Sequence, residues 1–272
     1  MTIDDLLIYA KKFIHKDQAK LLLADLLNKN PLELLNYLDE KVNEDVVQEY
    51  KKRVEAVSTG YPIQYAMGYV NFYGNKLFIN EDVLIPRFET EELVENTIKY
   101  IEDIFDYPVN IIDLGCGSGN IGLTLKQKLQ NSEVDLIDIS DKALDVCRKN
   151  ADNLGLDVNI YKSDFFSNVD NKYDVIISNP PYIKTEEEID DIVKNNEPAL
   201  ALYGGEDGLD YYRVIFNDIK NHLKEKFLIA LEIGYTEQEQ LVDLISNTLD
   251  KVKIDCKKDL SGKDRMIFIY NE

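Results

Sequence analysis

Four consecutive residues, Asn179-Pro180-Pro181-Tyr182, combine side chains and backbone that can hold a planar NH2 group. They follow the strand-like run 173–178, so we expect them at the carboxyl edge of an open α/β sheet, where such sheets bind ligands. The two prolines fix φ and remove two N–H donors, which leaves a rigid turn with free carbonyls. Asn179 and a backbone carbonyl can each accept one N–H, while the Tyr182 ring stacks on the plane. Taken alone, the tetrapeptide is equally consistent with a plain proline-rich turn.

A glycine-rich motif, Gly115-Cys116-Gly117-Ser118-Gly119, lies upstream between a buried strand-like run and the apolar helical stretch 121–129. Glycines let a backbone turn sharply and approach a ligand closely, and the helix start behind them presents free N–H groups. Residues 117–122 also satisfy the G-x-G-x-x-G dinucleotide fingerprint. Asp138, 19 residues after Gly119, stands where a ribose-binding acid belongs. NAD is therefore admissible on this evidence.

A carboxylate, Asp113, closes the strand immediately before this loop and favours another cofactor. It would repel a pyrophosphate and attract the ammonium of a methionine moiety. The pattern from Asp113 to Gly119 resembles the S-adenosylmethionine loop of class I methyltransferases. That resemblance implies that Asp138 holds the ribose hydroxyls, and that Asp164 and Phe165, after a third strand-like run, meet the adenine amino group and ring. Ligand-like residues at successive strand ends lead us to S-adenosylmethionine rather than NAD.

The tetrapeptide and this cofactor together predict methyl transfer to a nitrogen. Methyltransferases that carry the tetrapeptide modify adenine N6, cytosine N4 or a glutamine side-chain amide, whose lone pairs are delocalised. Because the transfer is an in-line displacement, the protein helps chiefly by positioning and electrostatics. Hydrogen bonds to Asn179 Oδ1 and the Pro180 carbonyl would aim the lone pair, and Tyr182 would hold the plane. We expect no general base, since both histidines, His15 and His222, fall in helical stretches away from the motifs.

The charge of the chain bears on the methyl acceptor. The sequence has 31 basic and 51 acidic residues, a formal net charge of −20 and a pI near 4.5. Binding to DNA needs a positive face, and the sequence offers only short basic pairs such as Lys257-Lys258. Although an acidic chain can still present a local basic groove, this balance favours a basic protein partner that is steered electrostatically.

Several further segments are similar to one family. They are Tyr61-Pro62-Ile63-Gln64-Tyr65 with Gly68 and Phe72-Tyr73-Gly74, then Leu84–Glu91, Glu197–Leu200, Gly204–Leu209, Leu231–Gly234 and Asp259–Arg265. With them, roughly residues 60–270 resemble the protein-(glutamine-N5) methyltransferases of peptide-chain release factors, the HemK/PrmC family. Phe88 departs from that family's Pro-Arg-Pro-Glu-Thr-Glu signature at the second proline, whereas Arg87, Glu89, Thr90 and Glu91 keep it.

The resemblance implies methylation of the glutamine in the Gly-Gly-Gln motif of bacterial-type release factors, with an effect on translation termination and S-adenosyl-L-homocysteine as product. It assigns acceptor binding to Asn179, Pro180, Pro181 and Tyr182, of which Asn179, Pro180 and Tyr182 are the catalytic candidates. It assigns cofactor binding to Asp113, Gly115, Cys116, Gly117, Ser118, Gly119, Asp138, Asp164, Phe165 and Asn179. Phe165 stands where many relatives have a tryptophan.

Arg87 and Glu89 receive no catalytic role. In the structural interpretation, Thr90 is the N-cap of a helix, with Glu91 and Glu92 in its first turn.

The predicted fold class is α/β: a seven-stranded, mostly parallel, doubly wound sheet of the class I methyltransferase type, with a small N-terminal helical bundle and a linking β-hairpin. We expect residues 1–69 to form the bundle and dock the release factor, residues 70–84 to form the hairpin linker, and residues 85–272 to form the methyltransferase domain.

Within the bundle, Pro31 should start a helix that carries Leu34, Leu35 and Leu38 into the core. The hairpin should turn at Gly74-Asn75. The runs 252–256 and 266–270 should close the sheet as an antiparallel pair. Residues 183–210 are either a lid on the substrate side or a solvated surface.

The remaining signals set the context of the chain. Cys116, Cys147 and Cys256 are isolated in sequence, which indicates neither a zinc site nor a disulfide framework. With no signal peptide or membrane-spanning run, we expect a cytoplasmic monomer that contacts neither membrane nor nucleic acid. A nucleic-acid methyltransferase and a non-catalytic scaffold of the same fold stay open as alternatives.

Overall fold

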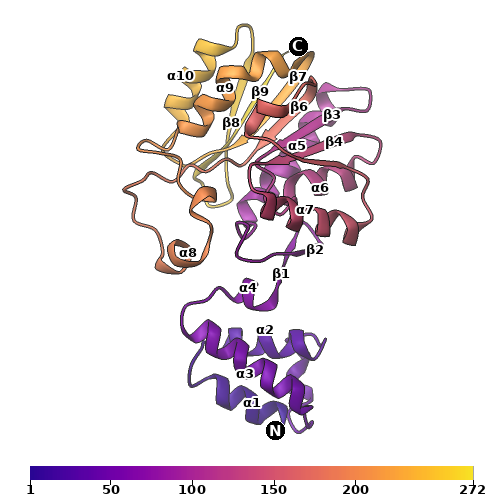
Figure 1. Cartoon of the computed structure of the whole chain (residues 1–272), viewed down its shortest axis with the longest axis vertical. Helices are drawn as coiled ribbons and strands as arrows, with labels where there is room; N and C mark the ends of the chain where they lie inside the picture. Colours follow the sequence, from indigo (N-terminus) through magenta and orange to yellow (C-terminus); the bar gives the residue numbers. More distant parts are fainter. Residues whose placement is uncertain (272) are drawn as a thin grey trace. The chain divides into compact units, whose positions relative to one another are not determined.

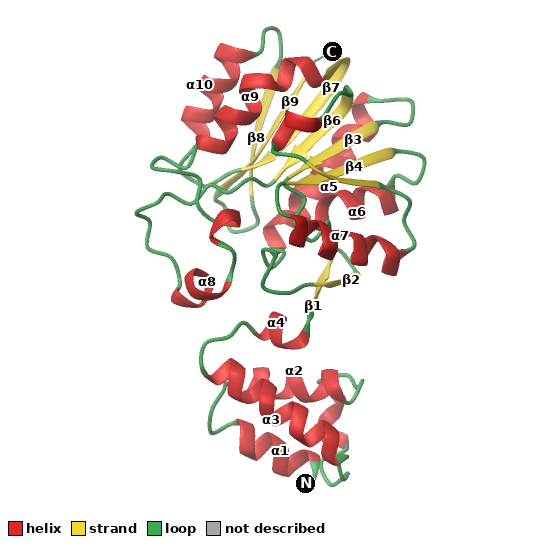
Figure 2. Cartoon of the chain, viewed as in Figure 1, coloured by secondary structure: helices red, strands yellow, loops and turns green. Residues whose placement is uncertain are grey.

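The computed structural model describes residues 1–271, which form two compact units. The smaller unit comprises residues 1–69 and 190–196, and the larger comprises residues 70–189 and the chain from residue 197 onward. Figure 1 labels the elements along the chain, and Figure 2 separates helices from strands. The segment 190–196, which contains α8 (Asp191–Asn196), thus belongs with the N-terminal residues, a grouping that the sequence did not suggest. The docking role of residues 1–69 stays a prediction.

The smaller unit is helical and has its own apolar core. Its further elements are α1 (Ile3–Ala10), α2 (Lys16–Leu26), η1 (Glu33–Asn36), α3 (Glu44–Ser58) and α4 (Ile63–Met67). The helical spacing of apolar residues forms these elements, because it brings Leu6, Leu22, Leu23, Tyr50 and Val54 to one interior where each is fully buried.

The helix predicted after Pro31 is wrong. Only the short 3-10 turn η1 forms there, so Leu34 is buried while Leu35 is 54% exposed. The chain after the turn is engaged elsewhere, because the N–H of Ile3 donates to the carbonyl of Glu40. Backbone pairing with the start of α1 keeps these residues out of a helix.

A two-stranded hairpin, β1 (Tyr69–Phe72) and β2 (Asn75–Phe78), follows, and all of it but Tyr69 belongs to the larger unit. Its turn lies at Tyr73-Gly74, with φ of 49° and 83°, rather than at the predicted Gly74-Asn75. A two-residue hairpin turn of type I′ needs positive φ at both central positions. The hairpin is confirmed, and its turn is one residue earlier because Asn75 already belongs to β2.

The main sheet has seven strands in the order β5-β4-β3-β6-β7-β9-β8, with β9 antiparallel to both of its neighbours. The strands are β3 (Asn110–Leu114), β4 (Glu133–Asp138), β5 (Asn159–Lys162), β6 (Tyr173–Ser178), β7 (Leu223–Glu232), β8 (Lys253–Lys258) and β9 (Asp264–Tyr270). The predicted fold class and the antiparallel C-terminal pair are confirmed. The chain leaves β3 toward β4 on one side and later returns to β6 on the other, so the switch point for ligand binding lies at the ends of β3, β4 and β6.

Helices cover both faces of this sheet, as Figure 1 shows. One face packs against α5 (Phe88–Ile104), α6 (Asn120–Lys128) and α7 (Asp141–Leu154), and the other against α9 (Asp210–His222) and α10 (Gln238–Thr248). Every residue of β6 is buried because the strand has a helical layer on each side. No helix within residues 1–271 combines the length and apolar character that crossing a bilayer requires.

Candidate active site

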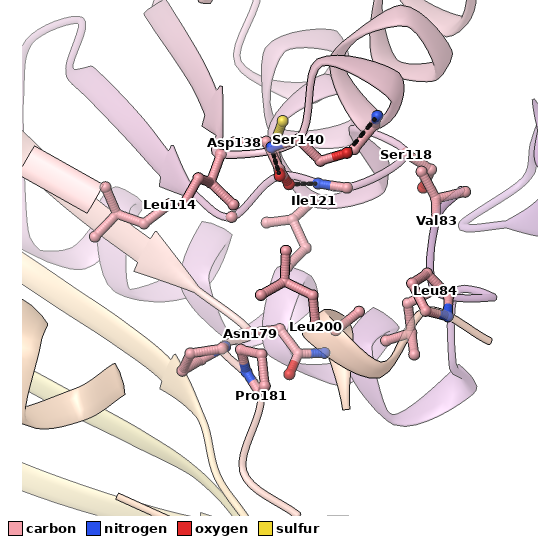
Figure 3. A pocket seen from close by; sticks show the side chains of 18 of the residues that line it. Val83, Leu84, Leu114, Ser118, Ile121, Asp138, Ser140, Asn179, Pro181 and Leu200 are labelled. Carbon is pink, nitrogen blue, oxygen red and sulfur yellow. Dashed lines mark hydrogen bonds between the residues drawn. The ribbon is translucent and has the colours of Figure 1, made fainter. Parts of the chain in front are cut away.

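A cavity of about 390 Å³ lies at the carboxyl ends of β3, β4 and β6 in the larger unit. Most of the predicted site residues line it: Gly115, Cys116, Gly117, Ser118, Asp138, Asp164, Phe165, Asn179, Pro180 and Pro181. Figure 3 shows Ser118 and Asp138 on one side of the cavity and Asn179, Pro181 and Leu200 on the other. The fold therefore brings residues from separate strand ends to one space.

The glycine loop is shaped by left-handed backbone at alternate positions. Gly115, Gly117 and Gly119 have φ of 72°, 53° and 79°, a region that residues with a Cβ rarely adopt. At Gly119 space is also limiting, because an added Cβ would lie 2.7 Å from Cys147 Sγ. Cys116 and Cys147, far apart in sequence, thus lie together here, and the neighbouring Cys147 thiol, together with burial, raises the pKa of the Cys116 thiol.

Asp138 ties the end of β4 to this loop. Its Oδ2 accepts the N–H of Gly117 and its Oδ1 accepts the N–H of Ser140, both at 2.9 Å. Burial raises the pKa of Asp138, against the lowering effect of these backbone N–H groups. A carboxylate has about four acceptor sites, so Asp138 can still accept hydrogen bonds from ligand hydroxyls in the cavity.

Asp113 is placed differently from the prediction. It is buried beneath the first turn of α6, where its Oδ2 accepts the N–H of Gly122 at 2.9 Å, and it does not line the cavity. Its Oδ1 has no hydrogen-bond partner within residues 1–271. Burial raises the pKa of Asp113 to about 7. The predicted contact with a ligand ammonium stays a prediction.

Phe165 reaches the cavity through an unusual backbone. Its φ is 44°, a conformation that is costly for a bulky residue. The turn is held from Ser163, whose hydroxyl donates to the Phe165 carbonyl and accepts the N–H of Asn168 at 3.0 Å. The Phe165 ring lies 5.7 Å from the ring of Tyr211 between centroids, and both line the cavity. Two aromatic rings, rather than the one predicted, are available to a planar ligand.

The tetrapeptide forms the opposite wall, with the exception of Tyr182. Pro181 lines the cavity, and its carbonyl would lie 2.5 Å from a Cβ added at Gly204. A Cβ at Gly208 would lie 2.5 Å from the Tyr182 carbonyl. The two glycines let the segment after residue 203 pack directly on the backbone of the tetrapeptide, which holds the turn in place.

Tyr182 does not lie on the cavity wall, although we predicted that its ring stacks on the acceptor. Its hydroxyl donates to Glu232 Oε1 at 3.3 Å and accepts from Arg265 Nη1 at 3.2 Å. Burial and the Glu232 carboxylate raise the pKa of Tyr182. This pair of hydrogen bonds explains the placement, and an acceptor-binding role for Tyr182 stays a prediction.

The N-cap of α5 is Arg87, so the prediction of Thr90 at that position is wrong. Thr90 is instead the third residue of the helix. It is buried, and its hydroxyl donates to Glu232 Oε2 at 2.7 Å. It also accepts from Asn179 Nδ2 at 3.3 Å and lines the cavity.

A partly buried ion pair, in which the Glu197 side chain is buried, fixes the rest of the wall. Arg87 Nη2 lies 2.6 Å from Glu197 Oε1, and the N–H of Ile85 donates to Glu197 Oε2 at 3.0 Å. These bonds join the backbone around Leu84 to the turn that carries Leu200, and both leucines line the cavity. Sequence reasoning missed these roles, although the segments Leu84–Glu91 and Glu197–Leu200 carried part of the family resemblance.

Neither histidine takes part in this wall. His15 caps α2 in the smaller unit. His222 stacks on Phe166 with ring centroids 4.3 Å apart. The cavity therefore offers backbone and side-chain acceptors, aromatic rings and carboxylates, among them the half-buried Asp138 and the exposed Asp164.

Comparison with known proteins gives two matching family models. Residues 93–201 match the methyltransferase small domain, and residues 10–68 match the PrmC N-terminal domain. The chain is 36% identical over 283 residues to the release factor glutamine methyltransferase of Bacillus cereus, with all of both chains covered. It is 37% identical over 278 residues to the enzyme of that name from Bacillus subtilis, with 98% of this chain and 96% of the relative covered.

A solved structure of a methyltransferase from Pyrococcus furiosus is similar in fold. It superposes with a TM-score of 0.53 at 17% identity, covering 81% of this chain and 96% of that one.

Proposed function

Because the chain belongs to the release factor glutamine methyltransferase family, we propose that it methylates the side-chain amide nitrogen, N5, of the glutamine in the Gly-Gly-Gln motif of a release factor. The observation that carries this proposal is the meeting of the glycine loop and the Asn179-Pro180-Pro181 turn in one cavity. One side suits a nucleoside-bearing cofactor and the other suits a planar NH2 group.

The methyl donor is S-adenosylmethionine, which supplies an electrophilic methyl group when bound and leaves as S-adenosyl-L-homocysteine. The residues present fit this group. Asp138 has free acceptor sites for ribose hydroxyls, and Phe165 with Tyr211 offers ring faces for adenine. The glycine loop lets the ligand approach its backbone closely. Asp164, beside Phe165, is the acid available to the adenine amino group.

The acceptor amide binds at Asn179 and Pro180. Asn179 Oδ1 and the Pro180 carbonyl each accept one N–H of the glutamine NH2 group, which turns its nitrogen toward the cofactor side of the cavity. Both acceptors also stabilise the positive charge that develops on nitrogen during transfer, and this electrostatic contribution is largest where water is excluded. No group of the protein needs to remove a proton before the transfer.

Residues 1–69 dock the release factor in this proposal. The net charge of −20 supports an encounter with a basic partner rather than with nucleic acid. The reaction then belongs to the cytoplasm, where translation terminates.

Methyl transfer from radiolabelled S-adenosylmethionine tests the proposal. The acceptors are a bacterial release factor, the same factor with the Gly-Gly-Gln glutamine changed to glutamate, duplex DNA and ribosomal RNA. We expect label on the unmodified factor alone, and loss of that label with Asn179→Ala. An Asn221→Ala variant is a matched control, because Asn221 is exposed on α9 and its side-chain NH2 group donates to Asp218 on the same helix. Label on nucleic acid but not on the factor would overturn the proposal.

A further inference from the structure

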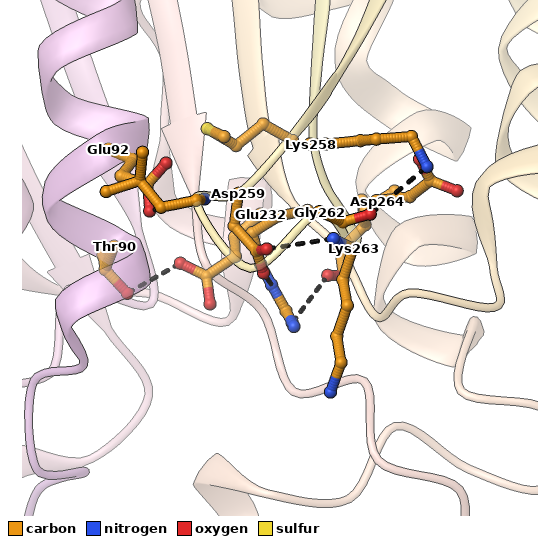
Figure 4. Close-up of polar contacts among 12 residues, drawn as sticks. Thr90, Glu92, Glu232, Lys258, Asp259, Gly262, Lys263 and Asp264 are labelled. Atoms are coloured by element: carbon orange, nitrogen blue, oxygen red, sulfur yellow. Dashed lines mark hydrogen bonds and ion pairs between the residues drawn. The ribbon is translucent and has the colours of Figure 1, made fainter.

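A buried line of hydrogen bonds runs from the cavity into the protein. Asn179 Nδ2 donates to Thr90 Oγ1 at 3.3 Å, and Thr90 Oγ1 donates to Glu232 Oε2 at 2.7 Å. Figure 4 shows Thr90 on α5 facing Glu232 at the end of β7. Thr90 and Glu232 are each only 1% exposed, so water does not substitute for either partner.

The other oxygen of Glu232 is held by a second line. Arg265 Nη1 donates to the Tyr182 hydroxyl at 3.2 Å, and that hydroxyl donates to Glu232 Oε1 at 3.3 Å. An arginine side chain has donors and no acceptor. Tyr182 therefore accepts from Arg265 and must give its own proton to Glu232. In both chains of hydrogen bonds, each group donates toward the Glu232 carboxylate, which only accepts.

This direction decides how the amide of Asn179 faces. An ionised Glu232 has no proton to donate, so the Thr90 hydroxyl donates to it and keeps only lone pairs for Asn179. Thr90 can then bond to the NH2 group of Asn179 and not to its oxygen. No hydrogen bond within residues 1–271 uses Asn179 Oδ1, so this oxygen is left for a ligand.

We propose that Thr90 and Glu232 are positioning residues that turn the Asn179 amide with its NH2 group into the protein and its Oδ1 toward the cavity. The proposal rests on the proposed function, because only the oxygen of Asn179 can accept a hydrogen bond from the acceptor glutamine. It also gives two segments of the family resemblance, around Thr90 and around Glu232, a common purpose.

The protonation state of the Glu232 carboxyl depends on its burial and on the neighbouring side chains. Burial raises its pKa to about 7, against the lowering effects of Thr90, Arg265 and Tyr182, while Glu89 raises it. From α9, the Tyr212 hydroxyl bonds to the Glu232 backbone carbonyl rather than to the carboxylate. Below about pH 7 the carboxyl gains a proton and can donate to Thr90, whose hydroxyl is then free to donate to Asn179. That reverses the amide and presents its NH2 group to the cavity.

Single-turnover methyl transfer to a release factor, at saturating cofactor and acceptor, tests the role of Thr90. Thr90→Val keeps the shape and removes the hydroxyl, and we expect a loss of rate on the order of 100-fold. Thr90→Ser should retain most of the rate because it keeps the hydroxyl. Thr97→Val is the matched control: Thr97 is buried on the same helix and its hydroxyl bonds to the Leu93 carbonyl. Equal rates for Thr90→Val and Thr97→Val, or a serine variant as slow as the valine variant, would overturn the proposal.

A second measurement does not depend on activity. The side-chain NH2 resonance of Asn179, identified by its loss in Asn179→Ser, is followed by NMR from pH 6 to pH 8. We expect it to shift with a midpoint near pH 7 in the wild-type protein and to be independent of pH in Glu232→Gln. The rate of Glu232→Gln should likewise lack a rise through pH 7. A signal that is flat in the wild type, or that titrates equally in both proteins, contradicts the inference. Absence of label on the wild-type factor, with the titration present, would instead defeat the proposed function alone.

Discussion

The two sides of the cavity are built differently. On the cofactor side, hydrogen bonds join residues that are close in sequence: Gly122 donates to Asp113, 9 residues away, and Gly117 donates to Asp138, 21 residues away. On the acceptor side Asn179 bonds to Thr90 across 89 residues, and Thr90 to Glu232 across 142. A loop with local bonds depends on its own sequence, whereas a turn with distant bonds depends on the completed sheet. Variants on the two sides should therefore fail in different ways.

The largest effect should come from breaking the cofactor side at Gly119. In Gly119→Ala the new Cβ lies 2.7 Å from Cys147 Sγ, and the alanine must also keep the left-handed φ of this position. We therefore expect the free energy of unfolding to fall by about 3 kcal/mol. Gly155→Ala is the control, since its φ is 64° with nothing within 4 Å of the added atom, and it should cost about 1 kcal/mol. Urea denaturation measures both. Equal losses would mean that the loop tolerates the clash by moving.

The second-largest effect should come from substituting Glu197 on the acceptor side. Glu197→Ala removes the partner of Arg87 and of the Ile85 N–H, which should cost about 2 kcal/mol. We also expect slower methyl transfer at unchanged cofactor affinity, because the wall around Leu84 loses its attachment. Glu95→Ala is the control, because Glu95 pairs with Lys99 on an exposed face of α5 and exposed ion pairs contribute little to stability. A loss of cofactor affinity larger than the loss of rate would show that the two sides are not separable.

The same difference between local and distant hydrogen bonds explains which features of the protein could be predicted from its sequence. The positions of the glycine loop, Asp138 and Phe165 could be predicted because each lies at or shortly after the end of a strand that is visible in the sequence. The burial of β6 between two helical layers follows from its continuous apolar run, Val175–Ile177. The placement of Tyr182 could not be predicted, since it depends on Glu232 and Arg265, which reach it only through the order of the strands.

Local propensity also gave wrong answers where distant partners compete. Thr90 is a good N-cap residue by type, but its hydroxyl bonds to Glu232 instead. The residues after Pro31 have helical spacing, but backbone pairing with the start of α1 limits them to a single turn.

The two sides each contain one buried acid with a pKa raised to about 7, Asp113 and Glu232. A raised pKa means that the folded protein holds a proton that the unfolded chain releases, so stability from this group is present below about pH 4 and is lost as pH rises toward 7. From pH 5 to pH 6 we expect the wild-type protein to lose about 1 kcal/mol of unfolding free energy relative to Asp113→Asn. Denaturation at the two pH values measures the difference. A constant difference would mean that Asp113 is ionised throughout, with a cation or water at its unpaired Oδ1.

The smallest effect should come from the aromatic contact on the cofactor side. Phe165→Ala removes one of the two rings that line the cavity, and a stacked ring contributes about 1 kcal/mol. We therefore expect the Kd for S-adenosyl-L-homocysteine, measured by calorimetry, to rise about fivefold. Phe165→Trp should bind at least as tightly as the wild type, because the larger ring keeps the face and adds area. Tyr211 makes this effect small, since it can still cover part of the ligand, and the double variant with Tyr211→Ala should lose more than the sum of the two single losses. Additive losses would show that the rings contact different parts of the ligand, and no loss in either variant would place the cofactor ring elsewhere in the cavity.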